Sequence, residues 1–338
     1  MKLSHRKITV ALASPFRISR STTEHAQLLE VAIESNGVVG YGEAAPQARY
    51  HESIESASGF LAEAEPLLGS DPFALDAISR RLSSVAGEMA AKSALDAALH
   101  DLCGKLAGVP VWKLLGHDRV GPPTSWTVWL GDPDDMAQRA AEAAPRFQRL
   151  KLKLGGRDGL DVDRVRAVRA VTDRPLMVDI NEYWTLDEAL DSVVALAELN
   201  VEYVEQPLPA GDEGGAKLRE ASPLPIYLDE DCHTLSDIAS CARRAHGVNL
   251  KLTKSGGIRE AVRMAHAARA LGLGVMLGCM IETGLGIAAG CQVAPLCDYV
   301  DLDGNLLLAD DPWSGVEFAD GVQTPSEAVG LGVAARAA

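Results

Sequence analysis

The stretch from residue 116 to residue 305 alternates short apolar runs with segments of helical periodicity, and this alternation limits the chain to a few folds. A strand, a helix and a further strand in succession favour parallel pairing, because the crossover helix returns the chain to the same edge of the sheet. Eight such runs favour closure into a barrel over an open doubly wound sheet. The runs lie at 125–131, 149–154, 175–180, 201–206, 225–230, 247–254, 274–279 and 298–303.

Residues 1–115 follow a different pattern. Residues 1–60 alternate in the manner of strands, with Asn36-Gly37 as a hairpin turn, and residues 53–115 show helical periodicity. The first residues have a basic start, but the apolar run 8–13 is shorter than the core of a signal peptide, so we expect a first strand there. The pattern predicts a separate α+β domain over 1–115, followed by the barrel over 116–305.

Composition excludes several classes of protein. The formal net charge of −15 argues against nucleic-acid binding, because phosphate contacts need clustered lysine and arginine. No stretch is long and apolar enough to span a bilayer. The six cysteines form no C-x-x-C pair, which predicts reduced thiols in the cytoplasm rather than disulfides or a zinc site. The glycines of 271–278 lie between a helix and a strand, the wrong order for a dinucleotide-binding loop.

A polar residue marks the carboxyl end of almost every barrel run. The spacing from one run to the next is between 24 and 26 residues over the first six of them. These positions fall on the face where barrel enzymes build their active sites. The residues are Thr127, Lys153, Asp179, Glu205, Asp229, Lys254 and, after one run without a charged end, Asp301 with Asp303.

Three consecutive runs end in carboxylates, at Asp179, Glu205 and Asp229. Carboxylates brought together repel one another, and a hard divalent cation removes that conflict. Oxygen ligands without histidine or cysteine suit Mg²⁺ better than zinc. We therefore predict a Mg²⁺ site. The alternative is a cluster of salt bridges between these carboxylates and the neighbouring lysines.

Lysines flank the three carboxylates on both sides. Lys151 and Lys153 lie on alternate positions of one strand, so both side chains point to the same face. We expect Lys153 to act as a base, with Lys151 supplying positive charge beside it and contacting an anionic substrate. Lys254, from the far side of the barrel, is the predicted second base. Two such lysines allow a proton to leave one face of a substrate and return to the other.

Five motifs in these positions resemble the enolase superfamily: "KLK" at 151–153, "DIN" at 179–181, "EQP" at 205–207, "DED" at 229–231 and "KLTKSGG" at 251–257. The resemblance implies a (β/α)7β modified TIM barrel with residues 1–115 as an α+β capping domain and residues 306–338 returning to that cap. It also implies α-proton abstraction through an ene-diolate beside Mg²⁺. Asn181 and Glu230 are then expected next to the metal ligands.

The "DLDG" motif at 301–304 resembles the dipeptide epimerases of that superfamily. In that group the two carboxylates hold the free ammonium of a dipeptide, so Asp301 and Asp303 are the expected clamp, with Thr127 nearby. The resemblance implies a dipeptide with a small first residue such as Ala, epimerised at its C-terminal residue. A mobile loop over 15–23 is expected to contact the second side chain; it offers Arg17 and Arg20, of which Arg20 is the expected contact. Thr23 stands where Ala-Glu members carry their specificity arginine, so the resemblance does not extend to glutamate as the second residue.

Other readings stay open from the sequence. An N-acylamino-acid racemase, an o-succinylbenzoate synthase or a cycloisomerase would use the same metal and lysines without an ammonium clamp. A binding barrel without catalysis would normally have lost a ligand or a base, and none is missing here. The run at 274–279 has no histidine, which argues against a His–Asp base, and we expect His233 to face solvent. We also expect a homo-oligomer.

Overall fold

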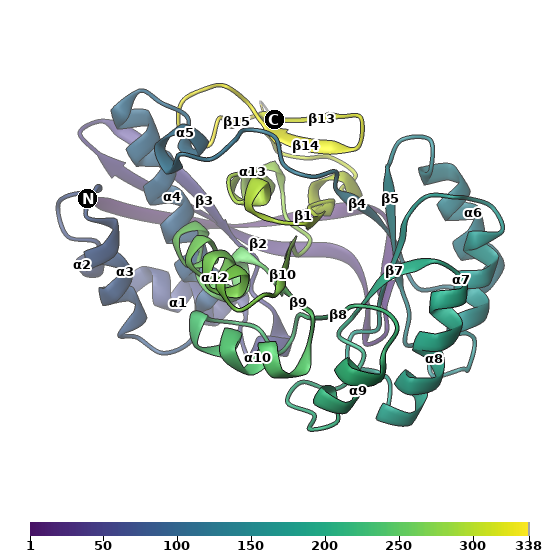
Figure 1. Cartoon of the computed structure of the whole chain (residues 1–338). Coiled ribbons are helices and arrows are strands. Elements are labelled where there is room, and N and C mark those ends of the chain that lie inside the picture. The colour runs from purple at the N-terminus through teal and green to yellow at the C-terminus, as the bar shows by residue number, and fades with distance from the viewer. Residues whose placement is uncertain (337–338) are drawn as a thin grey trace.

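The computed structural model describes residues 1–336 and contains a cap and a barrel (Figure 1). The cap sheet has the antiparallel order β1-β2-β3. Asn36 and Gly37 join β2 to β3 with φ angles of 52° and 75°, the left-handed pair that a tight hairpin requires. The strands are β1 (Lys2–Ile18), β2 (Ser21–Ser35) and β3 (Val38–Ala44). The helices are α1 (Ile54–Glu63), α2 (Glu65–Leu68), α3 (Leu75–Ser83), α4 (Met89–Ala107) and α5 (Val111–Leu115).

Helix α4 joins the cap to the barrel. It is buried from Ala90 to Gly104, as expected for a helix that is apolar on most of its surface. One side of it lies directly on β3, where a Cβ on Gly42 would come within 2.0 Å of the carbonyl oxygen of Ala94. Only glycine allows this close approach, so the "GYGEA" segment brings cap sheet and helix together.

The second part is a parallel sheet of eight strands in sequence order, β4 to β11. A single parallel bridge between Thr124 and Val300 joins its two edges into a nearly closed ring. This confirms the predicted barrel. The strands are β4 (Ser125–Val128), β5 (Arg149–Lys153), β6 (Leu176–Asp179), β7 (Val201–Glu205), β8 (Ile226–Leu228), β9 (Gly247–Leu250), β10 (Gly274–Gly278) and β11 (Tyr299–Asp301).

Seven helices follow the first seven barrel strands and cover the ring, which matches the expected (β/α)7β pattern (Figure 1). Between β9 and its covering helix lies an extra short helix, α11 (Leu252–Ser255). The covering helices are α6 (Pro133–Ala143), α7 (Asp161–Arg169), α8 (Leu186–Glu198), α9 (Gly215–Ala221), α10 (Ile238–Arg244), α12 (Ile258–Ala270) and α13 (Gly284–Cys291).

Aromatic residues fill the interior of the barrel. Tyr203, Tyr227 and Tyr299 pack together, with ring centroids 4.7 to 5.7 Å apart. Tyr227 fits because Gly247 has no side chain: a Cβ there would come within 2.2 Å of its ring. The barrel is therefore a packed core, and only its mouth is open to a ligand.

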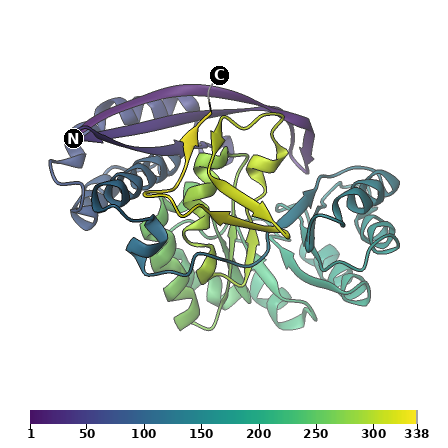
Figure 2. The ribbon, with the colours of Figure 1, turned by 90° about the horizontal axis from the view of Figure 1, so that it is seen from above.

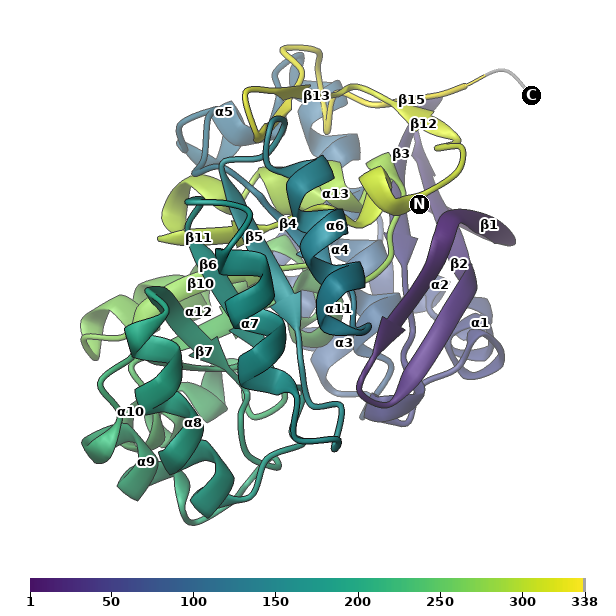
Figure 3. The same ribbon diagram turned by 90° about the vertical axis from the view of Figure 1, so that its right-hand side faces the viewer.

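The last described residues return to the cap. Figure 2 shows part of the yellow C-terminal segment reaching the purple hairpin of β1 and β2, and Figure 3 shows β12 (Trp313–Ser314) and β15 (Ala334–Ala335) beside β3. Trp313 Nε1 donates a hydrogen bond to Glu30 Oε1 at 2.8 Å, and the Leu331 amide donates to Asp101 Oδ1 at 2.7 Å. The strands are β12 (Trp313–Ser314), β13 (Val316–Ala319), β14 (Val322–Pro325) and β15 (Ala334–Ala335).

Candidate active site

Three predicted residues stand side by side at the mouth of the barrel. Lys153 pairs in register with Asp179 across β5 and β6, and Asp179 pairs with Glu205 across β6 and β7. Lys153 Nζ donates to Asp179 Oδ2 at 2.6 Å and to Asn181 Oδ1 at 3.4 Å. The equal spacing of strand ends in the sequence thus becomes contact in space, as predicted.

Lys151 lies at the centre of the site with only 1% of its surface exposed. Its Nζ lies 2.7 Å from Glu205 Oε2, 2.9 Å from Asp301 Oδ2 and 3.3 Å from Asp179 Oδ2. Burial lowers the pKa of Lys151, but the charges of Asp301, Glu205 and Asp179 outweigh it and hold the pKa well above its usual value. Lys151 is therefore a fixed positive charge within the site.

Asp229 follows β8 and is held by two lysines. Lys251 Nζ lies 2.7 Å from Asp229 Oδ2, and Lys254 contacts Asp229 Oδ1. Burial acts to raise the pKa of Asp229, but the two ammonium groups hold it well below the usual value. Asp229 is thus an ionised carboxylate beside Asp179 and Glu205, as the sequence predicted.

The structure does not bring Lys254 to the cavity, which corrects the predicted second base. Strand β9 ends at Leu250, and Lys254 lies on the helical turn α11, pointing into the protein. Its Nζ is fully buried and donates to the carbonyls of Asp229, Cys232 and Asn249. Lys251, the first residue after the strand, lines the cavity instead. The apolar run "GVNL" ends directly before Lys251, and this end of the run is the signal in the sequence that could have identified Lys251.

The oxygen atoms of this cluster fit a cation. Burial, followed by the charge of Asp179, raises the pKa of Glu205 to about 7, so the negative charge of this group is poorly compensated. Glu205 Oε2 and Glu230 Oε2 are buried and accept no hydrogen bond. The contact of Lys151 with Glu205 Oε2 is an ion pair without hydrogen-bond geometry. Within residues 1–336 these carboxylates contact lysines. In this arrangement no three His, Cys, Asp or Glu side chains are grouped closely enough to hold a metal ion.

Asp301 and Asp303 differ in their surroundings. Asp301 accepts from Ser125 Oγ at 2.6 Å and from Lys151, so its charge is balanced. Asp303 accepts from the Thr127 amide at 2.7 Å, and no cationic side chain of residues 1–336 lies within 4.0 Å of it. Burial and the charge of Asp301 raise the pKa of Asp303 to about 7. Of these two aspartates, Asp303 is therefore the one without a cationic partner among residues 1–336.

The predicted mobile loop over 15–23 is instead the end of a hairpin, because β1 continues to Ile18 and β2 begins at Ser21. Arg20 stands at its turn and reaches the barrel. Its Nη2 lies 2.9 Å from Glu230 Oε1, and its Nη1 donates to the carbonyl of Asn181 at 3.4 Å. Arg20 lines the cavity, as expected, but its guanidinium is paired with the protein's own carboxylate.

One cavity of about 650 Å³ lies between cap and barrel, and it is lined by Lys151, Lys153, Lys251, Asp301 and Asp303. That volume lies within the range of small-molecule sites. Tyr50 adds a wall from the cap, and His233 packs edge-on against it at 4.8 Å. His233 is half-buried and its Nε2 lies 3.0 Å from the Glu230 carbonyl, so the expectation that it faces solvent was wrong.

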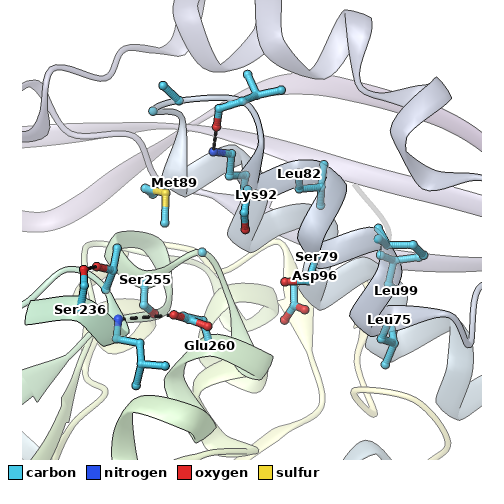
Figure 4. A pocket seen from close by; sticks show the side chains of 18 residues that line it. Leu75, Ser79, Leu82, Met89, Lys92, Asp96, Leu99, Ser236, Ser255 and Glu260 are labelled. Carbon is cyan, nitrogen blue, oxygen red and sulfur yellow. Dashed lines mark hydrogen bonds between the residues drawn. The ribbon is translucent and has the colours of Figure 1, made fainter. Parts of the chain in front are cut away.

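A second cavity, of about 590 Å³, lies between α3, α4 and the barrel (Figure 4). Its lining includes Lys92, Asp96 and Glu260. Lys92 Nζ contacts the Val85 carbonyl, and Glu260 Oε1 accepts from the Leu235 amide at 3.3 Å, so these groups serve the fold. The predicted site residues therefore line the first cavity and not this one.

Known proteins share this architecture. The family model described as "Enolase C-terminal domain-like" matches residues 135–338, and the "Mandelate racemase / muconate lactonizing enzyme, N-terminal domain" model matches residues 2–116. An L-Ala-D/L-Glu epimerase of Bacteroides thetaiotaomicron is 41% identical over 93% of this chain and 82% of its own.

Two solved structures superpose closely. The substrate-liganded L-Ala-D/L-Glu epimerase of Bacillus subtilis has a TM-score of 0.96 and 31% identity, covering 100% of this chain and 99% of its own. A dipeptide epimerase of Enterococcus faecalis, complexed with Mg and L-Leu-L-Tyr, has a TM-score of 0.93 and 32% identity, covering 98% of each chain. The chain belongs to the enolase superfamily, among its dipeptide epimerase-like members.

Proposed function

We propose that the protein epimerises dipeptides at the α-carbon of the C-terminal residue with the help of Mg²⁺. The observation that carries this proposal is the placement of Lys153 and Lys251. They lie on β5 and directly after β9, four strands apart in a ring of eight, and both line the same cavity. A substrate between them presents opposite faces of its α-carbon to the two amines, which is what inversion of a stereocentre requires.

The two lysines divide the chemistry between them. The neutral amine of one takes the α-proton, and the ammonium of the other returns a proton to the opposite face. Asp179, Glu205 and Asp229 would hold Mg²⁺, which when bound stabilises the charge that the substrate carboxylate gains as the α-proton leaves. Lys151, held charged by its carboxylate partners, adds positive charge at the same end of the substrate.

The other end of the substrate meets β11. Asp303 is buried without a cationic partner among residues 1–336, and a dipeptide ammonium supplies one. Ala is our proposed first residue, because the resemblance to Ala-specific members carries over to this end. An N-acylamino acid, a succinylbenzoate precursor or a muconate has no such ammonium, so the alternatives on this scaffold leave Asp303 unpaired.

The test is α-proton exchange in D₂O with purified protein, Mg²⁺ and a panel of L-Ala-L-Xaa dipeptides. Deuterium at the C-terminal α-carbon together with the L,D product supports the proposal. Faster turnover of N-acylated amino acids than of free dipeptides would favour an N-acylamino-acid racemase instead. A chain that exchanges none of these substrates would contradict an epimerase.

Three further expectations belong to the proposal. We propose that 1–115, 116–305 and 306–338 are the cap, the barrel and the returning segment. We also propose a cytoplasmic homo-oligomer. No helix of residues 1–336 is long and apolar enough to cross a membrane, and all six cysteines are free thiols. The buried thiols suit a reducing compartment.

A further inference from the structure

Glu182 binds arginines from two separate segments of the cap. Its carboxylate accepts from Arg49 Nε at 2.7 Å and from Arg49 Nη2 at 2.6 Å, a two-pronged pair. Arg20 Nη1 lies 3.5 Å from the same carboxylate. The Ala210 amide donates to Glu182 Oε1 at 3.0 Å, which fixes the acceptor to the barrel. One glutamate therefore ties the β1–β2 hairpin and the segment around Arg49 to the mouth of the barrel.

The second carboxylate that holds Arg20 is Glu230. Its side chain is fully buried, and its Oε2 accepts no hydrogen bond. Drawing Arg20 away would leave a buried charge without its cation, which is costly. Arg20 is therefore not free to bind an anionic ligand. Arg49 is likewise not free, because its Nε and Nη2 both donate to Glu182.

These arginines stand where the second side chain of a bound dipeptide must lie. In the proposed reaction the α-carbon lies between Lys153 and Lys251, and the packed tyrosines close the barrel below that position. The side chain can only extend upward to the cap. There it meets Ile18, Tyr50 and Ile54, which line the same cavity.

We infer that the enzyme selects an uncharged second residue over glutamate, and that Glu182 determines this specificity. The inference rests on the proposed function. A glutamyl carboxylate would enter a region whose two arginines already have internal partners, and the like charges of Glu182 and Glu230, which lie behind those arginines, would repel it. An apolar or amide side chain meets no such repulsion.

The experiment compares kcat/KM for L-Ala-L-Leu, L-Ala-L-Gln, L-Ala-L-Glu and L-Ala-L-Lys. Gln and Glu have the same shape, so their ratio reports charge alone. We expect Gln to exceed Glu by about tenfold or more, and Leu to equal or exceed Gln. A wild-type preference for Glu over Gln overturns the inference while the epimerase function stands. Turnover of no dipeptide at all refutes the function itself, which is a different result.

Glu182→Gln tests the residue. It removes the internal anion and frees Arg49, so kcat/KM for L-Ala-L-Glu rises by about tenfold relative to L-Ala-L-Gln. Activity with L-Ala-L-Leu stays within about twofold, because Glu182 touches no reacting atom. Glu213→Gln is the control: Glu213 is exposed on the neighbouring loop that carries Ala210, its side chain makes no hydrogen bond within residues 1–336, and the substitution leaves the profile unchanged. An unchanged Glu/Gln ratio in Glu182→Gln overturns the assignment.

Arg49→Gln gives a second and reciprocal readout if the first variant folds poorly. It leaves the Glu182 carboxylate without its two-pronged partner, directly behind an arginine that lines the cavity. We expect L-Ala-L-Lys to gain about tenfold in kcat/KM and L-Ala-L-Glu to gain nothing. An equal change for Lys and Glu substrates would show a merely structural role for the pair.

Discussion

Lys151 and Asp301 form a buried ion pair across the mouth of the barrel, with 2.9 Å between Nζ and Oδ2. The pair links the carboxylate cluster on β6 and β7 to the eighth strand, β11, because Lys151 also lies 2.7 Å from Glu205. As a consequence, the two aspartates of the D-x-D motif differ in whether the protein itself supplies them with a cationic partner. Asp301 already has a cation, and Asp303 is left for the ammonium of a substrate.

Asp303→Asn should lower kcat/KM for free dipeptides by about a few hundredfold, since removing one partner of a buried charge pair costs about 3–5 kcal/mol. The fold should persist, because Asn can accept the hydrogen bond from the Thr127 amide. Steady-state kinetics with L-Ala-L-Xaa measures the loss. N-acetyl-L-Ala-L-Xaa is the control: it should be a poor substrate for the wild type and lose little more in the variant. Equal turnover of both substrates by the wild type would contradict the clamp.

Lys153→Met and Lys251→Met should each abolish epimerisation, because each removes the proton donor or acceptor from one face of the α-carbon. Exchange of the α-proton in D₂O should survive in each variant with one diastereomer only, and the two variants should differ in which one. Mass spectrometry or NMR of recovered L,L- and L,D-dipeptides measures this. Loss of exchange with both diastereomers in both variants would leave one-base chemistry as the explanation.

Lys254→Met should act on stability. The substitution leaves Asp229 without one of its two lysines and removes one donor from each of three buried carbonyls, at a cost of about 3–5 kcal/mol. Urea denaturation of the variant measures the loss of unfolding free energy. Lys217→Met, at an exposed position, is the control and should change stability by less than about 0.5 kcal/mol. A fully stable Lys254→Met variant would show that this ammonium does not hold the strand ends together.

The carboxylates could be predicted because apolar runs end where strands end. Asp179 and Glu205 are the last residues of their strands, and parallel strands place such positions side by side. Lys254 is the exception, because its run at 247–254 contains both a strand and the beginning of a helical turn. The interval of 25 residues from Asp229 matched the repeat, but the strand had already ended before Lys251.

The partners of Arg20 could not be predicted from the sequence. Arg20 and Glu230 are 210 residues apart, and several carboxylates near the barrel mouth were equally plausible acceptors. The choice depends on where the β1–β2 hairpin ends, and that depends on how β1 pairs past the register shift between Ala11 and Phe16. Local pattern carries no information on such a tertiary arrangement.

Glu205→Gln should weaken Mg²⁺ binding and cut turnover by orders of magnitude, because a neutral amide replaces one of the three proposed ligands. Isothermal titration with Mg²⁺ alone measures binding without any need for activity. Added EDTA should abolish wild-type turnover, and excess Mg²⁺ should restore it. Glu202→Gln, three residues earlier on the outer face of the same strand, is the control. Undiminished activity of Glu205→Gln, or of the wild type in EDTA, would contradict the metal site.

Glu43 should make the cap–barrel contact sensitive to pH. It lies buried on β3 and accepts from the Thr283 amide at 2.8 Å, at the start of α13. Burial, against the hydrogen bonds from Thr283, raises the pKa of Glu43 to about 8 from 4.5. Between these two values the folded chain holds a proton that the unfolded chain has lost, so unfolding free energy falls as pH rises, by up to about 1.4 kcal/mol per pH unit from this group. Glu43→Gln mimics the protonated acid, and urea denaturation at several pH values should show the variant gaining on the wild type from pH 5 to pH 8. Glu55→Gln, exposed on α1, should follow the wild type, and parallel curves for all three proteins would rule out a buried proton at Glu43.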